Sequence, residues 1–491
     1  MSAKAFPDIH PEQRLLIDGQ LVAAASGNTY NNINPADNSV AGVCADAGVE
    51  DMERAIAAAR RAFDETDWST NHTFRAKCLK QLRDAMKAHA DELRYQMVAE
   101  IGCPLGLTYG PQTDLPISFM DWTIDFMEHY EWERELPTVN VVGVPSKRLV
   151  WKEAAGVVAA ITPWNFPSAM ITRKSGPALA AGCPIVLKPA TQTPFSALAL
   201  AELGHRAGLP AGVFNVVTGS ATQIGGEMTG NPIVRKLTFT GSTQIGKILL
   251  EQCAKTVKKT SMELGGNAPF IVFDDADLDA AVEGAIMSKY RNTGQTCVCA
   301  NRILVQDSVY DAFAAKLTAA VAKLKVGDGL KGETQQGPLI DMKAVEKVEE
   351  HIADAVKKGA KVVAGGKRHA LGHSFFEPTI LVNVTTDMAV TREETFGPVA
   401  PLFRFKTEEE AIRLANDTEF GLAAYFYARD LGRVWRVADA IETGIVGINT
   451  GIISTEVAPF GGVKESGLGR EGSKYGIEDF LEVKYMCMGG I

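Results

Sequence analysis

The sequence of 491 residues predicts an α/β protein that contains a doubly wound parallel sheet. From residue 156 onward, short apolar segments alternate with segments of helical periodicity, and a second alternation of this kind begins near residue 270. Strands of a parallel sheet are covered by helices on both faces, so continuous apolar runs are their expected signature. A chain of this length is too long to fold around a single hydrophobic core, so we expect two or three domains.

The first alternation follows the order of a βαβαβ unit. Its predicted strands are 156–162, 183–189, 213–219 and 236–241, and its predicted helices are 169–182, 193–208 and a glycine-rich segment before the last strand. Ligands of such sheets bind beyond the carboxyl ends of the strands. The candidate ligand-binding loops are therefore PWNFP (163–167), KPATQTP (188–194) and TGSTQIG (240–246).

The second alternation predicts a further α/β domain. Helices are predicted over 277–290 and 309–324 with a strand over 302–306 between them, and a helix followed by a strand is predicted over 351–366 and over 409–428. The C-terminal segment 479–491 is apolar and alternates near its end. Since an exposed terminal strand invites aggregation, we expect it to pair with another segment, and a second subunit is one option.

Composition and charge exclude several classes of protein. Acidic residues outnumber basic ones, and the net charge of −9 argues against a nucleic-acid-binding surface. No apolar run is long enough to cross a membrane, and the first residues lack the apolar stretch of a signal peptide, so we expect a cytoplasmic protein without membrane partners. The eight cysteines are scattered and form no CxxC pair, so neither a disulfide framework nor a bound metal is expected.

One cysteine lies in a setting that suits a nucleophile. Cys297, in RNTGQTCVCANR (291–302), follows a predicted helix in a short loop whose neighbouring residues are polar. Most free cysteines are small buried hydrophobes, but a polar loop is no core segment. Its base is either a histidine, with only His373 in a suitable loop, or Glu263, which leaves a strand into the Gly-Gly turn of ELGG.

The segment 236–252 predicts an anion site. An alternating strand is followed by Gly241 and Ser242 and then by a helix whose apolar residues are Ile245, Ile248 and Leu249. The free N–H groups and the dipole of a helix N-terminus favour anions. The spacing GxxxxG matches neither the dinucleotide fingerprint nor a P-loop, so this segment alone indicates only a phosphate or diphosphate.

Seven motifs together resemble those of the NAD(P)-dependent aldehyde dehydrogenase superfamily. In chain order they are PWNFP, KPATQTP, FTGSTQIG, ELGGNAP, GQTC, EETFGPV and PFGGVKESGLGRE. The resemblance implies the aldehyde dehydrogenase fold, which combines a doubly wound cofactor-binding domain, an α/β catalytic domain and a small β oligomerisation arm. The implied ranges are 1–125 and 148–263 for the cofactor-binding domain, 264–453 for the catalytic domain, and 126–147 and 474–491 for the arm. A homodimer or homotetramer is implied.

The resemblance also assigns the catalytic residues. Cys297 attacks the aldehyde, and the side-chain amide of Asn165 and the backbone N–H of Cys297 hold the oxyanion, because preorganised donors stabilise developing charge. Hydride transfer to NADP or NAD leaves a thioester, and Glu263 activates the water that hydrolyses it. Glu471 would support the path of the proton.

The cofactor-binding residues follow in the same way. They are Lys188 and Glu394 near the ribose hydroxyls, Phe396 near the nicotinamide, and Trp164, Gly241 and Ser242 along the adenine-to-diphosphate stretch. Strictly NAD-dependent relatives carry a glutamate where this chain has Thr191. A carboxylate there repels a 2′-phosphate, so a neutral threonine favours NADP over NAD.

Within the superfamily, the chain is most similar to succinate-semialdehyde dehydrogenases. The similarity rests on AMITRKSGPALAAG, GNAPFIVFDDADLD, GQTCVCANR, NTGIIS and KYGIEDFLEVKYMC. It implies that Arg173, Arg291 and Ser454 hold the distal carboxylate of the substrate, because a guanidinium binds carboxylates bidentately. The segment 101–143 departs from that branch, and its aromatic residues Phe119, Trp122 and Phe126 are either core packing or the wall of a wider tunnel. An aromatic or longer aliphatic aldehyde is therefore the alternative substrate.

Three other classes of protein are alternatives to a hydrolytic aldehyde dehydrogenase. Glu263 argues against a CoA-acylating dehydrogenase, because it favours transfer of the acyl group to water rather than to CoA. The joint presence of Cys297, Glu263 and Asn165 argues against a non-catalytic protein of the same fold. The cofactor motifs disfavour a Cys-His hydrolase. Cys299 lies two positions from Cys297, so it either packs below the loop or forms a strained, reducible disulfide that switches the enzyme off.

Overall fold

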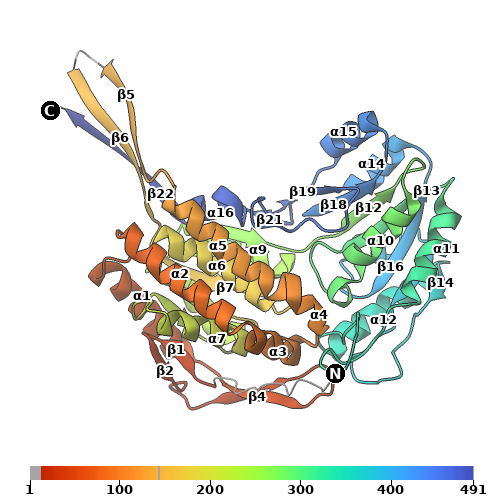
Figure 1. The fold of residues 1–491 in the computed structure, drawn as a ribbon, viewed down its shortest axis with the longest axis horizontal. Coiled ribbons are helices and arrows are strands. Elements are labelled where there is room, and N and C mark those ends of the chain that lie inside the picture. Colours follow the sequence, from red (N-terminus) through yellow and green to blue (C-terminus); the bar gives the residue numbers. More distant parts are fainter. Residues whose placement is uncertain (1–12, 142–143, 490–491) are drawn as a thin grey trace.

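The computed structural model describes residues 13–141 and 144–489, in which two mainly parallel sheets lie side by side (Figure 1). The first sheet has the order β2-β1-β9-β8-β7-β10-β11-β21. Its strands are β1 (Leu15–Ile17), β2 (Gln20–Val22), β7 (Val157–Ile161), β8 (Ile185–Lys188), β9 (Phe214–Val216), β10 (Val234–Thr240), β11 (Lys259–Glu263) and β21 (Gly467–Leu468). The five central strands are parallel, which confirms the predicted doubly wound sheet.

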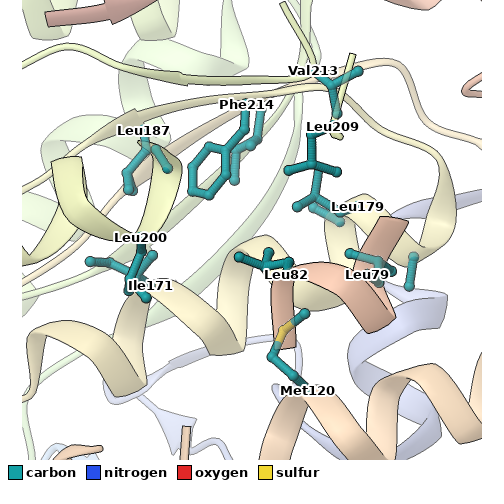
Figure 2. Close-up of a cluster of buried hydrophobic side chains, with 14 of the residues drawn as sticks. Leu79, Leu82, Met120, Ile171, Leu179, Leu187, Leu200, Leu209, Val213 and Phe214 are labelled. Carbon is teal, nitrogen blue, oxygen red and sulfur yellow. The ribbon is translucent and has the colours of Figure 1, made fainter. Parts of the chain in front are cut away.

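Helices cover both faces of this sheet. They are α1 (Val49–Glu65), α2 (His72–Ala88), α5 (Asp114–Glu128), α6 (Pro167–Ala181), α7 (Pro194–Arg206), α8 (Ala221–Gly230) and α9 (Thr243–Ala254). Successive residues of β7 face opposite cores: Val158 packs with α2, α5, α6 and α7, and Val157 with α1, α8 and α9. Figure 2 shows the first of these cores, where Leu79 and Leu82 of α2 lie near Leu179 of α6. Burial on both faces explains why the strands are continuous apolar runs.

The second sheet has the order β14-β15-β16-β13-β12-β18-β19 and is parallel apart from β14. Its strands are β12 (Ala268–Val272), β13 (Ala300–Gln306), β14 (Lys361–Ala364), β15 (Thr379–Val382), β16 (Val399–Phe405), β18 (Ala423–Tyr427) and β19 (Ile445–Ile448). Its helices are α10 (Leu278–Lys289), α11 (Tyr310–Val321), α12 (Met342–Lys357), α13 (Ala389–Arg392), α14 (Glu408–Asn416) and α15 (Leu431–Ala440). The predicted second α/β unit is thereby confirmed.

A three-stranded sheet projects from the body as an arm (Figure 1). It contains β5 (Glu133–Val141), β6 (Val144–Ala154) and β22 (Leu481–Gly489). The C-terminal strand pairs with β6 of the same chain, from Leu481↔Ala154 to Gly489↔Ser146, so one of its two edges has an intramolecular partner. The division of the chain into domains stays a prediction, and its boundaries at 126 and 148 fall inside α5 and β6.

The remaining elements are short or connect the two sheets. They are β3 (Thr29–Ile33), β4 (Val40–Ala45), α3 (Ala90–Ile101), α4 (Leu105–Leu107), η1 (Thr108–Gln112), η2 (Arg291–Gly294), β17 (Phe420–Gly421), β20 (Val463–Lys464) and α16 (Ser473–Glu478). Throughout the described residues, no helix combines the length and apolar character needed to span a membrane.

Candidate active site

A cavity opens where loops from both sheets meet. The residues that line it are Pro111, Leu115, Pro163, Trp164, Asn165, Phe166, Ala169, Met170, Arg173, Thr240, Gly241, Ser242, Leu264, Gly265, Arg291, Thr296, Cys297, Val298, Lys347, Glu394, Phe396, Ser454 and Phe460. The loops that follow β7 and β10 contribute to this wall, as the position of ligand sites in parallel sheets predicts. The KPATQTP loop after β8 does not contribute.

Cys297 reaches the cavity from a tightly constrained loop. In the preceding turn η2, Asn292 and Thr293 have φ values of 51° and 57°, which are costly for residues other than glycine. A Cβ atom at Gly266 would lie 2.4 Å from the carbonyl oxygen of Cys297, so the loop passes too close for any side chain there. Burial, and next the nearby Glu394 carboxylate, raise the pKa of the Cys297 thiol. The thiol is therefore protonated at rest and requires a base before it can attack.

The Asn165 side chain is anchored beside this loop. Its Nδ2 donates a hydrogen bond to the carbonyl of Gln295 at 3.1 Å, and its own backbone carbonyl accepts from Nε2 of Gln112 at 2.9 Å and Nδ2 of Asn292 at 3.0 Å. A primary amide has two N–H donors, so Nδ2 keeps a second donor beyond the one used by Gln295. The amide and Cys297 share the cavity wall.

Glu263 and Glu471 lie behind the cavity wall, not on it. Glu263 ends β11, and burial together with the like charge of Glu471 raises its pKa well above the usual value. Both carboxylates have a buried Oε2 atom without a hydrogen-bond partner. The Nζ of Lys174 lies 2.5 Å from Oε1 of Glu471 and donates to Thr238 at 3.0 Å. The sequence interpretation assigned no role to Lys174, although it lies beside Arg173 in AMITRKSGPALAAG, because the motif does not show that Lys174 meets Thr238 and Glu471.

Arg173 and Arg291 present two guanidinium groups to the cavity. Arg173 is held between the rings of Phe119 and Phe460, at 4.6 and 4.3 Å from their centroids. The Nε atoms of both arginines are buried without a hydrogen-bond partner, and neither arginine forms an ion pair within the described part of the chain. Ser454 lines the same cavity. Two cavity-lining cations without an ion-pair partner among the described residues, of which Arg173 is buried, favour an anionic ligand.

The aromatic residues of α5 do not form a substrate tunnel. Trp122 and Phe126 stack on each other with centroids 4.9 Å apart, Phe119 is buried against Arg173, and none of the three lines the cavity. The tunnel alternative is therefore wrong for this stripe, whose rings pack within α5 and against its neighbours. Among the described residues of the segment 101–143, only Pro111 and Leu115 reach the cavity wall.

Most of the predicted cofactor residues line this cavity. Trp164, Gly241, Ser242, Glu394 and Phe396 line it, and the rings of Trp164 and Phe396 meet edge-to-face at 5.6 Å. Phe396 has a φ of 52°, and burial raises the pKa of Glu394 to about 7. The Ser242 Oγ accepts from the N–H of Ile245 at 3.4 Å and thereby caps α9.

Two predicted cofactor residues and two apolar residues of α9 lie elsewhere. Lys188 is buried outside the cavity wall, donates to the carbonyl of Pro189 at 3.0 Å, and has its pKa lowered by burial to about 8. Thr191 is exposed on the loop that follows. On α9, Leu249 is buried as expected for an amphipathic helix, but Ile245 and Ile248 are exposed, because they lie on the outer face of the helix.

Cys299 is fully buried, and its thiol donates to the carbonyl of Lys289 at 3.7 Å. Both Cys297 and Cys299 are free thiols, so the disulfide switch stays a prediction. Within the described residues, no cluster of three or more His, Cys, Asp or Glu side chains is arranged to hold a metal ion. Besides Lys174, which lies outside the wall, the sequence interpretation missed several residues of the wall itself, among them Leu115, Phe166, Met170, Leu264, Lys347 and Phe460. Apolar wall residues carry no signal in a sequence that separates them from core residues.

Comparisons with known proteins agree with this arrangement. The model of the aldehyde dehydrogenase family matches residues 21–486. The chain is 62% identical over 480 residues to a glutarate-semialdehyde dehydrogenase of Pseudomonas aeruginosa, covering 98% of each chain. It is 60% identical over 477 residues to a succinate-semialdehyde dehydrogenase [NADP(+)] of Escherichia coli, covering 97% of this chain and 98% of the relative.

Solved structures extend the similarity to three dimensions. The crystal structure of an NADP-dependent enzyme of E. coli superposes with a TM-score of 0.95 at 59% identity and covers 98% of both chains. The predicted family and fold are thus confirmed. The sequence motifs, the two-sheet fold and these matches together show that this chain belongs to the aldehyde dehydrogenase family.

Proposed function

We propose that this protein oxidises an aldehyde that carries a distal carboxylate, with succinate semialdehyde as the leading candidate and NADP as the preferred hydride acceptor. The observation that carries the proposal is the pair of cavity-lining guanidiniums, Arg173 and Arg291, which lack a counter-ion among the described residues. Relatives named for glutarate and succinate semialdehyde support the same class of substrate.

Substrate binding places the aldehyde for attack. Arg173, Arg291 and Ser454 hold the carboxylate, and their charge-assisted hydrogen bonds are stronger than neutral ones. The carbonyl end then lies against Cys297. Glu263 takes the proton of the thiol and passes it toward Glu471, and the thiolate attacks the carbonyl carbon. The oxyanion accepts hydrogen bonds from the free donor of Asn165 Nδ2 and from the backbone N–H of Cys297.

The residues of the cavity fit a nicotinamide dinucleotide. The capped N-terminus of α9 at Ser242 suits a diphosphate, and the Trp164–Phe396 pair offers an aromatic surface in the cavity that Cys297 also lines. When bound, the cofactor supplies the acceptor for the hydride that leaves the substrate carbon. Glu394 in the cavity and Lys188 outside its wall would hold the ribose hydroxyls, and the neutral Thr191 would tolerate a 2′-phosphate.

Glu263 completes the reaction by hydrolysing the thioester on Cys297. Its raised pKa makes it a stronger base than an ordinary carboxylate, so it removes a proton from the attacking water. The proton passes from Glu263 toward Glu471, whose charge is balanced by Lys174. Cys297 leaves as the thiolate and the acid product is released.

The test compares succinate semialdehyde, glutarate semialdehyde, benzaldehyde and hexanal, each with NADP and with NAD, with and without CoA. We expect the highest kcat/KM for a semialdehyde with NADP, a free acid product and no dependence on CoA. Faster oxidation of hexanal or benzaldehyde contradicts the carboxylate specificity, and an acyl-CoA product contradicts hydrolysis. A strong preference for NAD contradicts the role of Thr191.

We further propose that the protein is a cytoplasmic homodimer or homotetramer. The projecting arm supports this proposal, because Val483 and Tyr485 of its edge strand β22 are exposed. Light scattering of the purified protein measures the mass in solution, and a monomer at micromolar concentration would contradict the oligomer.

A further inference from the structure

The loop that carries Thr191 is held by a residue from the N-terminal hairpin. This loop, residues 189–193, joins β8 to α7. Nδ2 of Asn32 donates to the carbonyl of Gln192 at 2.8 Å and lies 3.4 Å from the carbonyl of Thr191. Asn32 belongs to β3, about 160 residues earlier in the chain. A single amide thus reaches the two backbone carbonyls at the middle of the loop.

Asn32 occupies an unusual place in its strand. It is the one buried residue of β3, 2% exposed, and the register of the β3–β4 pair shifts directly after it. Such irregularities re-aim side chains near functional sites. Its Oδ1 is buried without a partner, so burial of this side chain is costly, and only the Nδ2 donors offset the cost. The hydrogen bonds that Asn32 donates to the loop therefore explain why an amide stands at this position.

A second anchor holds the end of the same loop. The buried carboxylate of Glu100 on α3 accepts from the backbone N–H groups of Phe195 and Ser196 at 2.6 and 3.0 Å, and from the Ser196 hydroxyl. These contacts fix the first turn of α7. Glu100 thus fixes the start of α7, and the contacts of Asn32 add a second fixed point at the middle of the loop, whose turn is closed by the N–H of Thr193 bonding to the carbonyl of Ala190 at 3.0 Å.

We propose that Asn32 determines cofactor specificity by fixing the backbone on which Thr191 meets the adenine ribose. This inference rests on the cofactor role proposed for Thr191. The Thr191 side chain is exposed and, among the described residues, its hydroxyl bonds only to the adjacent Gln192 side chain at 3.2 Å, so its position follows its backbone. Without the amide of Asn32 the loop samples other positions, and the distinction between a 2′-phosphate and a 2′-hydroxyl weakens.

The experiment measures kcat/KM for NADP and for NAD at saturating aldehyde in Asn32→Leu and Asn32→Asp. Loss of one or two neutral hydrogen bonds predicts a fall of about three- to tenfold in the NADP/NAD ratio for Asn32→Leu. Asn32→Asp points an acceptor at two carbonyls and is expected to lower the ratio further. The KM for the aldehyde should not change.

The matched control is Asn38→Leu, in the turn that links β3 to β4. Asn38 Nδ2 lies 3.0 Å from Nδ1 of the exposed His373 and does not touch the cofactor loop. The control should keep the wild-type ratio. An unchanged ratio in both Asn32 variants, or equal losses for both cofactors with a lower melting temperature, would overturn the proposal.

A further variant separates this inference from the proposed function. Thr191→Glu places a carboxylate where a 2′-phosphate is expected and should shift preference toward NAD. If it does so while the Asn32 variants keep the wild-type ratio, only the role of Asn32 is wrong. If Thr191→Glu leaves the ratio unchanged, the cofactor role of Thr191 itself is wrong, and the inference falls with it.

Discussion

Arg173→Met is expected to impair oxidation of a carboxylated aldehyde while sparing a neutral aldehyde of the same length. Arg173 is buried, lines the cavity and has no ion-pair partner within the described residues, so a substrate carboxylate would be its counter-ion. A hydrogen bond to a charged group contributes about 1.5–3 kcal/mol. Since about 1.4 kcal/mol corresponds to a factor of ten, kcat/KM for succinate semialdehyde should fall about 10- to 150-fold.

The same substitution should change the stability of the protein little. Removing the cation relieves the cost of its burial, which also lowers the pKa of Arg173. Against this, the cation–π contacts with Phe119 and Phe460 are lost, at about 0.5–2 kcal/mol each. Methionine fills a similar volume without a charge. These opposing effects predict a change in the free energy of unfolding within about 2 kcal/mol.

The assay compares succinate semialdehyde with butanal, which has the same carbon chain without the carboxylate. Arg291→Met is the companion variant, and the double variant should lose less than the product of the two single losses, because both guanidiniums would bind one carboxylate. Chemical denaturation of each variant reports the free energy of unfolding. An equal loss with butanal, or less than a threefold loss with succinate semialdehyde, would refute the reasoning.

Three further predictions concern the chemistry around the thiol. Glu471→Gln removes a negative charge that raises the pKa of Glu263, so the acidic limb of the pH profile for thioester hydrolysis should move to lower pH. Stopped-flow measurement of turnover after the first burst gives this profile, and a shift to higher pH contradicts the prediction. Gly266→Ala places a Cβ 2.4 Å from the carbonyl oxygen of Cys297, so kcat should fall at least tenfold, and wild-type kcat would show that the loop can yield. Cys299→Ala should resist reversible inactivation by peroxide. If peroxide inactivates this variant as it does the wild type, and reductant restores both equally, the disulfide switch is excluded.

Local sequence patterns predicted the architecture because parallel strands are buried on both faces. In β7, Val157 and Val158 face different cores, and such a strand has no polar face to interrupt its apolar run. The same holds for β12 in the second sheet, where Phe270 and Ile271 separate in the same way. The polar loop around Cys297 was likewise visible, because polar residues between a helix and a strand mark a loop.

The motif comparison extended these patterns to the candidate site, but it assigned no role to residues whose function depends on partners far away in the chain. Lys174 was not found, since its partners Thr238 and Glu471 are distant in sequence and meet only where α6 packs on the first sheet. The aromatic stripe of α5 was ambiguous for a similar reason. Helical spacing places Trp122 and Phe126 on one face but does not say what that face contacts.

The sequence by itself determined the order of strands and helices, the family and the identity of the reactive groups, because these depend on residue type and short spacing. Only the tertiary structure decided which charges lack a counter-ion, which rings enclose Arg173, and which backbone Asn32 holds. Those properties depend on contacts between segments far apart in the chain. Packing of the two sheets, rather than any local pattern, therefore places Cys297 in a cavity with two unpaired arginines.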